Sequence, residues 1–96
     1  MTAYVIANVD VHDAGAYEAY RSRTLEIIEA HGGRFVVRGG DIDVLEGEPS
    51  VHRFVVIEFP DRAAARRWYD SPEYQAIVPL RTNTSTGALF IVDGAQ

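Results

Sequence analysis

Two segments of the chain are apolar at nearly every position and lack the alternation of a strand with one wet face. In residues 4–9 only Asn8 is polar, and in residues 54–59 only Glu58 is. Continuous apolar runs of this length are typical of strands covered on both faces. We therefore expect residues 4–9 and 52–59 to form the central strands of a sheet. The apolar run at residues 88–92 predicts a last strand.

Apolar and aromatic side chains recur at helical spacing between residues 14 and 30, which predicts an amphipathic helix. Asp10 or Asp13 is expected to begin this helix and Gly32 to end it. The stripe that we expect to face the core consists of Tyr17, Tyr20, Thr24, Ile27, Ile28 and His31.

The second half of the chain repeats this order. Pro60 and Asp61 follow the second central strand and predict a helix over residues 62–69. Ser71 and Pro72 predict the start of a short helix, which we expect to end where Pro79 interferes. Residues 82–87 are rich in Thr and Ser and predict a polar loop before the last strand.

Two glycine pairs, at residues 32–33 and 39–40, bracket a short strand. Glycine allows sharp reversals where a Cβ would clash, so this strand is expected to be tied closely to its neighbours. Regular alternation would place Arg34 and Arg38 on one face and Phe35 and Val37 on the other. Residues 41–49 alternate weakly and predict a continuation of the strand or a ribbon.

The predicted order is strand, helix, strand, strand, helix, strand, without a linker, so residues 1–96 are expected to form a single domain. This is the split β-α-β, or ferredoxin-like, arrangement of the α+β class. It has an antiparallel sheet with helices on one face. We expect the first and third strands to lie parallel in the middle of that sheet.

Helices on one face leave the other face of such a sheet uncovered. Alternate residues such as Val5, Ala7, Val55 and Ile57, or their neighbours, would then be exposed to water. Burying apolar surface is worth roughly 25 cal/mol per Å² before association costs. The sequence therefore predicts a homodimer whose sheets pack face to face.

Composition narrows the possible partners and chemistry. The net charge is -5, which disfavours nucleic acid and membrane surfaces as partners. No signal peptide or membrane span is expected, so the cytoplasm is the expected location. Cysteine is absent, which excludes disulfides and thiolate chemistry, and all nine basic side chains are arginine. Without lysine there is no side-chain amine for a Schiff base, whereas the planar guanidinium suits carboxylates and other oxyanions.

With these residues placed, the chain resembles the domain of unknown function family 1330, within the dimeric α/β-barrel superfamily. The likeness rests on Tyr17, Tyr20 and residues 31–40, 45–47, 56–60 and 68–75. The resemblance implies a ferredoxin-like homodimer. It brings no established substrate, and related members of the superfamily include cofactor-independent oxygenases, isomerases, haem enzymes and ligand-sensing modules.

Three candidates for proton transfer or polar recognition stand in apolar surroundings. Glu58 is a candidate general base or acid, because a buried carboxylate is costly to keep charged, or else it forms a structural pair with Arg38 or Arg53. Asn8, on the neighbouring strand, is a candidate substrate contact. His31 either shuttles a proton or caps the end of its helix.

Arginines and aromatic residues are the candidates for holding a ligand. Arg38 could clamp a carboxylate or enolate oxygen, and Arg81 could add an anion contact unless it is merely solvated. A set of aromatic side chains either packs the core or lines a pocket for a flat organic ligand. These are Tyr17, Tyr20, Trp68, Tyr69 and Tyr74.

No motif predicts a metal or a cofactor. His12, His31 and His52 lack the spacing of metal ligands, and the glycine pairs lack the spacing of a nucleotide-binding loop. None of the serines stands in the sequence of a nucleophile turn.

Two hypotheses for the function remain. One is a cofactor-independent enzyme for proton transfer, oxygenation or isomerisation of a small oxygen-bearing substrate, aromatic or not. The other is a non-catalytic dimeric module that binds a small acidic metabolite.

Overall fold

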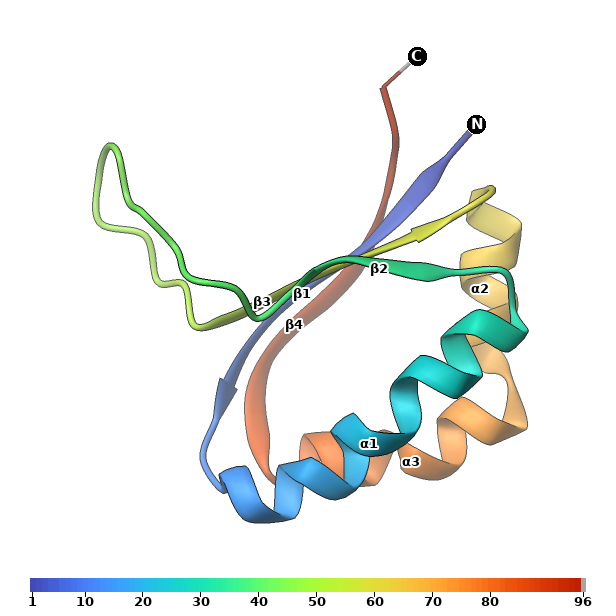
Figure 1. The fold of residues 1–96 in the computed structure, drawn as a ribbon, viewed down its shortest axis with the longest axis horizontal. Coiled ribbons are helices and arrows are strands. Elements are labelled where there is room, and N and C mark those ends of the chain that lie inside the picture. The colour runs from blue at the N-terminus through green and yellow to red at the C-terminus, as the bar shows by residue number, and fades with distance from the viewer. Residues whose placement is uncertain (96) are drawn as a thin grey trace.

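The computed structural model describes residues 1–95 and consists of one four-stranded sheet with helices packed on one of its faces (Figure 1). The strand order is β2-β3-β1-β4, and every neighbouring pair is antiparallel. The elements in chain order are β1 (Ala3–Val11), α1 (Ala14–Ala30), β2 (Arg34–Arg38), β3 (Arg53–Phe59), α2 (Arg62–Asp70), α3 (Pro72–Thr82) and β4 (Ser85–Asp93). The predicted ferredoxin-like α+β fold is confirmed.

The two doubly apolar segments are indeed the central strands, but their expected direction was wrong. β1 and β3 run antiparallel, with Val5 opposite Ile57 and Ala7 opposite Val55. In the split arrangement β3 is inserted between β1 and β2, so the parallel strands of each β-α-β unit are never neighbours.

Alternation along the central strands divides the sheet into two faces. The inner face, toward the helices, is fully packed: Val5, Ala7, Val55 and Ile57 are all buried. They pack with Ile28 of α1 and with aromatic side chains of all three helices, namely Tyr17, Tyr20, Trp68 and Tyr74. The outer face carries their neighbours along each strand and faces away from the helices.

Side chains at the helix starts explain where the helices begin. Asp13, rather than Asp10, caps α1 by accepting a hydrogen bond from the Ala16 N–H, at 3.1 Å. Asp61 caps α2 in the same way, accepting from Ala64 at 2.7 Å. Ser71 Oγ accepts from the Tyr74 N–H at 3.2 Å and begins α3.

The end of α3 differs from the prediction. The helix continues through Pro79 to Thr82, and β4 begins at Ser85, so residues 82–87 are mostly not a loop. Hydroxyl groups satisfy the last carbonyl oxygens of the helix: Thr84 Oγ1 donates to Leu80 O at 2.6 Å, and Ser85 Oγ to Arg81 O at 2.6 Å. The polar residues thus serve a tight helix-to-strand connection.

Residues 41–49 form neither a strand nor a ribbon. They belong to an exposed connection between β2 and β3 that projects away from the sheet (Figure 1). Leu45, near its tip, is 91% exposed. Weak alternation without a neighbouring strand to pair with is insufficient to form a sheet.

A β-bulge at Val36 changes the faces of β2. Arg34 lies opposite Glu58 and Phe35 opposite Ile57, but after the shift Val37 lies opposite Val56 and Arg38 opposite Val55. Arg34 therefore belongs to the outer face and Arg38 to the inner face. The expectation that the two arginines share a face was wrong, because the extra residue breaks the alternation.

Candidate functional site

A small cavity lies between the inner face of the sheet and the helices, with a volume of about 30 Å³. One water molecule needs about 10–15 Å³ of such space, so the cavity admits only a ligand of a few heavy atoms. Strands supply an apolar floor, and the helices supply the aromatic wall. The floor consists of Ala7, Val9, Phe35, Val55, Ile57 and Leu89, and Tyr17, Tyr20, Ile28 and Trp68 complete the apolar lining.

The remaining lining residues are Arg21, Thr24, Arg38, Arg53 and Arg81, and no Asp or Glu lines the pocket. Arg21 is neutralised by an exposed ion pair with Glu18. Within residues 1–95, Arg38, Arg53 and Arg81 form no ion pair with a carboxylate. The pocket therefore concentrates uncompensated positive charge in a protein whose net charge is negative.

Arg38 stands at the rim, at the end of β2. Its guanidinium lies 4.2 Å from the centre of the Phe35 ring and donates hydrogen bonds to Arg21 O at 3.0 Å and Thr24 Oγ1 at 3.3 Å. Burial against apolar surface lowers the pKa of Arg38, and the charges of Arg21 and Arg53 lower it further. The charges of these arginines therefore lie close enough to interact.

Arg53 begins β3, and its guanidinium lies 5.9 Å from the centre of the Tyr17 ring. Gly39, with φ +68°, passes directly beside this guanidinium, where a Cβ would collide with it. The Gly39 N–H also donates to Phe54 O at 2.9 Å. These contacts hold the ends of β2 and β3 together, so Arg38 and Arg53 form one side of the pocket.

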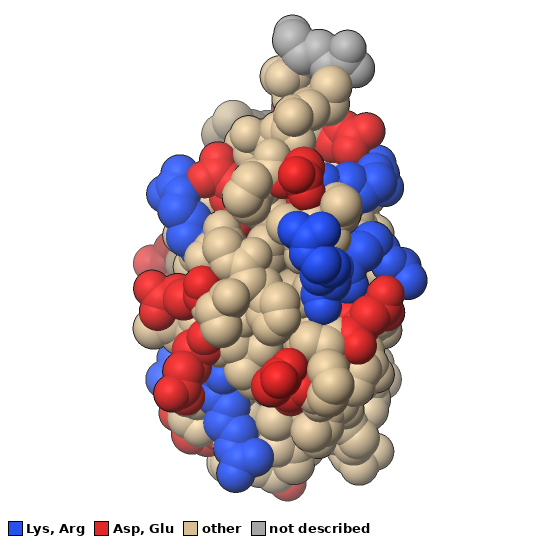
Figure 2. Space-filling view, turned by 90° about the vertical axis from the view of Figure 1, so that its right-hand side faces the viewer, with Lys and Arg blue, Asp and Glu red and all other residues tan. Residues whose placement is uncertain are grey.

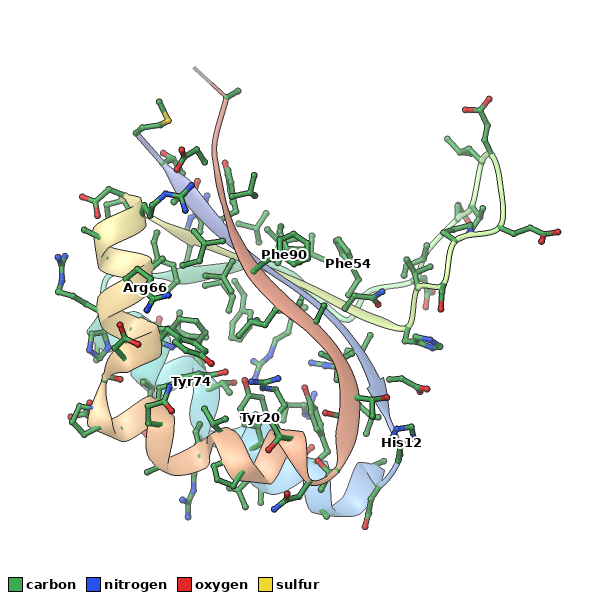
Figure 3. The ribbon with its side chains drawn as sticks, turned by 180° about the vertical axis from the view of Figure 1, so that it is seen from behind. His12, Tyr20, Phe54, Arg66, Tyr74 and Phe90 are labelled. Atoms are coloured by element: carbon green, nitrogen blue, oxygen red, sulfur yellow. The ribbon has the colours of Figure 1, made fainter. Side chains whose placement is uncertain are left out.

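Tyr20 and Tyr74 join α1 to α3 through their hydroxyl groups, which are 2.7 Å apart (Figure 3). Arg81 of α3 lies 6.0 Å from the centre of the Tyr20 ring. Burial raises the pKa of Tyr20, as does the proximity of Tyr74, and burial likewise raises the pKa of Tyr74. Both tyrosines therefore stay protonated at neutral pH and act as hydrogen-bonding groups rather than as bases.

Three buried nitrogen atoms in residues 1–95 have no hydrogen-bond partner: Arg53 Nε, Arg81 Nε and Trp68 Nε1. All three belong to residues that line the pocket. A buried donor without an acceptor costs about 1–3 kcal/mol, so such groups are rare in stable cores. These three side chains therefore offer donors that a bound acceptor could use.

Glu58 and His31 lie outside this pocket. Glu58 is on the outer face, where Arg34 donates to it, so its ion-pair partner is neither Arg38 nor Arg53. Its side chain is 25% exposed. The Nδ1 atom of His31 is 2.9 Å from Ile27 O at the end of α1, which fits a helix cap. The structure therefore does not bring either residue together with Arg38.

Asn8 also lies on the outer face. Its side-chain amide donates to Ser50 O at 2.8 Å, and its Oδ1 accepts from the His52 N–H at 3.0 Å. These two hydrogen bonds fix the end of the long β2–β3 connection to the middle of the sheet. In this structure Asn8 holds the backbone and does not contact the pocket.

The ten candidates from the sequence thus divide into two groups. Five line the pocket: Tyr17, Tyr20, Arg38, Trp68 and Arg81. Tyr74 is fully buried and does not line the pocket. Tyr69 packs against Trp68 and lines a different pocket.

Sequence reasoning missed Arg53 and Thr24 as pocket residues. The signal was present for Arg53, because it is two residues before Val55 and so shares the inner face of β3. Arg53 and Glu58 are five positions apart in the strand, and an odd difference in position places the two side chains on opposite faces. Thr24 was predicted to belong to the stripe of α1 that faces the core, but no contact with a pocket was predicted for it.

A second polar cluster lies in an open pocket on the outer side of the sheet, where His52 Nε2 is 3.4 Å from Ser50 Oγ and His52 Nδ1 is 3.8 Å from Asp10 Oδ1. Residues 1–95 contain no group of three His, Cys, Asp or Glu that could hold a metal ion. None of the helices within these residues is long and apolar enough to cross a membrane. On the face shown in Figure 2, basic and acidic side chains are interspersed over the surface.

The fold is shared with several solved structures at low sequence identity. A protein of unknown function from Rhodopseudomonas palustris is 22% identical, with a TM-score of 0.77 over 99% of this chain and 83% of that chain. SnoaB, a cofactor-independent oxygenase from Streptomyces nogalater, is 20% identical, with a TM-score of 0.67 over 99% and 94% of the two chains. A dimeric ferredoxin-like protein of unknown function from Jannaschia sp. CCS1 is 16% identical, with a TM-score of 0.63 over the whole of both chains.

Likeness at this level of identity shows the fold alone. No curated protein matches the sequence. A family model described as "Domain of unknown function (DUF1330)" matches residues 2–95. The match extends over nearly the whole chain, and the chain therefore belongs to the DUF1330 family.

Proposed function

We propose that this protein binds a small organic anion in the pocket between its sheet and its helices. One observation carries the proposal: Arg38, Arg53 and Arg81 line a largely apolar cavity in which no carboxylate balances them. Guanidinium groups pair with carboxylates through two parallel hydrogen bonds, which are stronger than bonds between neutral groups. A bound anion would neutralise the charge that otherwise makes the arginines repel one another.

Enzymatic turnover without a cofactor is the second candidate, favoured by the same arginines. Groups that hold a carboxylate also stabilise an enolate or phenolate oxygen, on which negative charge develops during proton loss. SnoaB, which has this fold, is a cofactor-independent oxygenase. Glu58 and His31 lie outside the pocket, and the Tyr20–Tyr74 pair is held protonated, so in this structure the pocket itself supplies hydrogen-bond donors rather than a base.

The proposal is tested by calorimetric titration of the protein with acetate and with acetamide, which has a similar shape but no charge. We expect acetate to bind and acetamide to bind at least tenfold more weakly. Arg53→Gln should weaken acetate binding about tenfold or more, because a charged hydrogen bond is worth about 1.5–3 kcal/mol.

Arg23→Gln is the matched control, since Arg23 is exposed on α1 and does not line the pocket. Its affinity for acetate should equal that of the unmodified protein. Equal affinity for acetate and acetamide, or equal losses in Arg53→Gln and Arg23→Gln, would refute an anion site in this pocket.

We also propose that a second copy of the chain covers the outer face of the sheet. Phe90 and Val92 of β4 are 51% and 44% exposed there, and Phe54 of β3 lies on the same face, with β1 between the two strands (Figure 3). The protein from Jannaschia sp. CCS1, which has the same fold, is dimeric. Light scattering at micromolar concentration should give twice the chain mass.

Phe90→Glu should shift the mass toward that of one chain, whereas Leu45→Glu, on the projecting connection, should not. A single-chain mass for the unmodified protein would contradict this part of the proposal.

A further inference from the structure

We infer that the ligand of the pocket is a carboxylate of one or two carbon atoms, and that Val55 sets this limit on its length. The inference rests on the proposed anion site and gives it a ligand class and a specificity-determining residue. The pocket has a volume of about 30 Å³, about two to three times the space that one water molecule needs. Formate and acetate are anions of this size, whereas each further methylene group needs room that the apolar lining occupies.

The charged end of the pocket lies where β2 ends and β3 begins, and Arg38 and Arg53 line it there. Arg38 is held in place because its guanidinium donates to Arg21 O at 3.0 Å and to Thr24 Oγ1 at 3.3 Å. Arg53 Nε is buried without an acceptor. A carboxylate has two oxygen atoms that accept hydrogen bonds from guanidinium groups, so this end of the pocket is assigned to the carboxylate.

Val55 stands beside both arginines on the inner face of the sheet. It is the cross-strand neighbour of Arg38, and it follows Arg53 by two positions in β3. Since every second side chain of a strand points to the same face, Arg53 and Val55 share the inner face, and both line the pocket. A carboxylate held by the two arginines therefore has its first carbon atoms next to Val55.

The row of residues across the sheet shows in which direction the ligand would lengthen. Arg38, Val55, Ala7 and Leu89 are successive neighbours across β2, β3, β1 and β4, and all four line the pocket. Ala7 carries only a methyl group. The branched side chain of Val55 is therefore the larger obstacle between the charged end of the pocket and the space above Ala7.

The remaining apolar groups near the arginines are aromatic rings that already contact the cations. The Phe35 ring centre lies 4.2 Å from the Arg38 guanidinium, and the Tyr17 ring centre lies 5.9 Å from that of Arg53. Cation–π contacts of this kind favour the present positions of the rings. These rings form the sides of the charged end, and Val55 is left to determine how long a carbon chain the pocket accepts.

The test is calorimetric titration of the full chain with formate, acetate, propionate and butyrate, which differ in the length of the carbon chain. We expect formate and acetate to bind, and propionate and butyrate to bind at least tenfold more weakly than acetate. In Val55→Ala, propionate should bind about fourfold more tightly than acetate, because the space left by the lost methyl groups buries its extra CH₂. Val55→Ile reduces the space instead, so acetate should bind at least tenfold more weakly than formate.

Val5→Ala is the matched control, since Val5 is buried on the same face of the sheet but does not line this pocket. It should keep the preference for acetate over propionate. Circular dichroism and thermal unfolding verify the fold of each variant, and Val55→Ile decides the question if Val55→Ala does not fold.

Two results would overturn this inference and leave the anion site standing. One is binding of propionate or butyrate to the native chain as tightly as acetate. The other is a chain-length preference that the Val55 variants do not change, or that Val5→Ala changes equally. If none of the four carboxylates binds to the native chain, the anion site is overturned together with the inference.

Discussion

Replacing Arg53 by Met should stabilise the folded protein while it removes ligand binding. Methionine keeps an unbranched side chain of similar reach but carries no charge and no N–H group. In the native chain, Arg53 Nε is buried without an acceptor, and the guanidinium repels the nearby Arg38. Removing an unsatisfied buried donor recovers about 1–3 kcal/mol of unfolding free energy.

One favourable contact opposes this gain. The Arg53 guanidinium lies 5.9 Å from the centre of the Tyr17 ring, and a cation–π contact at a partly exposed site is worth about 0.5–1 kcal/mol. The difference leaves a net stabilisation of about 1 kcal/mol. For a chain of this size such a change raises the melting temperature by about 4–8 °C.

The assay is urea denaturation of the two proteins without ligand, combined with titration by acetate. We expect a higher urea midpoint with an unchanged slope for Arg53→Met, and an affinity for acetate at least tenfold lower. Arg23→Met is the control: Arg23 is exposed and unpaired within residues 1–95, so its replacement should change the unfolding free energy by less than about 0.5 kcal/mol. If Arg53→Met is less stable than the native chain by 1 kcal/mol or more, Arg53 is a structural residue and the reasoning is refuted.

Three further predictions concern the core. Tyr20→Phe should lower the unfolding free energy by about 1–3 kcal/mol, because it removes the hydrogen-bond partner of the buried Tyr74 hydroxyl. Adding Tyr74→Phe to this variant should restore part of the loss. Additive losses of the two changes in urea unfolding would contradict the prediction. The unfolding free energy should fall as the pH rises above about 10. In the folded state the raised pKa of Tyr20 keeps its proton bound, whereas in the unfolded chain the tyrosine ionises at its ordinary pKa of 10.0. The variant that carries both Tyr20→Phe and Tyr74→Phe should show a shallower fall. Gly33→Ala should lower the unfolding free energy by about 1–3 kcal/mol, since the added Cβ would lie 2.6 Å from Phe59 Cε1 and 2.8 Å from Ile28 Cγ2. Gly40→Ala is the control: its Cβ would have no neighbouring atom within 4 Å, so thermal unfolding should be nearly unchanged.

The elements of the fold follow from local patterns, whereas the relations between them do not. The bounds of α1 agree with the prediction because its stripe and the cap at Asp13 lie within one continuous segment. The antiparallel pairing of β1 and β3 and the bulge at Val36 depend on contacts between distant segments, which periodicity alone does not encode. The projecting connection at residues 41–49 likewise has no neighbour to give it a regular structure.

The candidate site was predicted by residue type more successfully than by arrangement. Arginines and helix aromatics were singled out for their chemistry, and Arg38, Arg81 and Tyr20 share one pocket. Glu58 was grouped with them because it is the polar residue in an otherwise apolar strand. Since both faces of β3 are apolar, the sequence pattern does not reveal on which face of the sheet Glu58 lies.

The bulge in β2 has a practical consequence for protein engineering. Because Val36 is the extra residue, a variant that lacks it would retain the pairing of Phe35 with Ile57 and of Val37 with Val56. Deleting Val37 instead gives the same sequence, whereas deleting Phe35 would remove the ring that lies 4.2 Å from the Arg38 guanidinium. Loss of one of the two valines should therefore be the most tolerated single-residue deletion in this strand, and comparisons between distant relatives should allow a gap there.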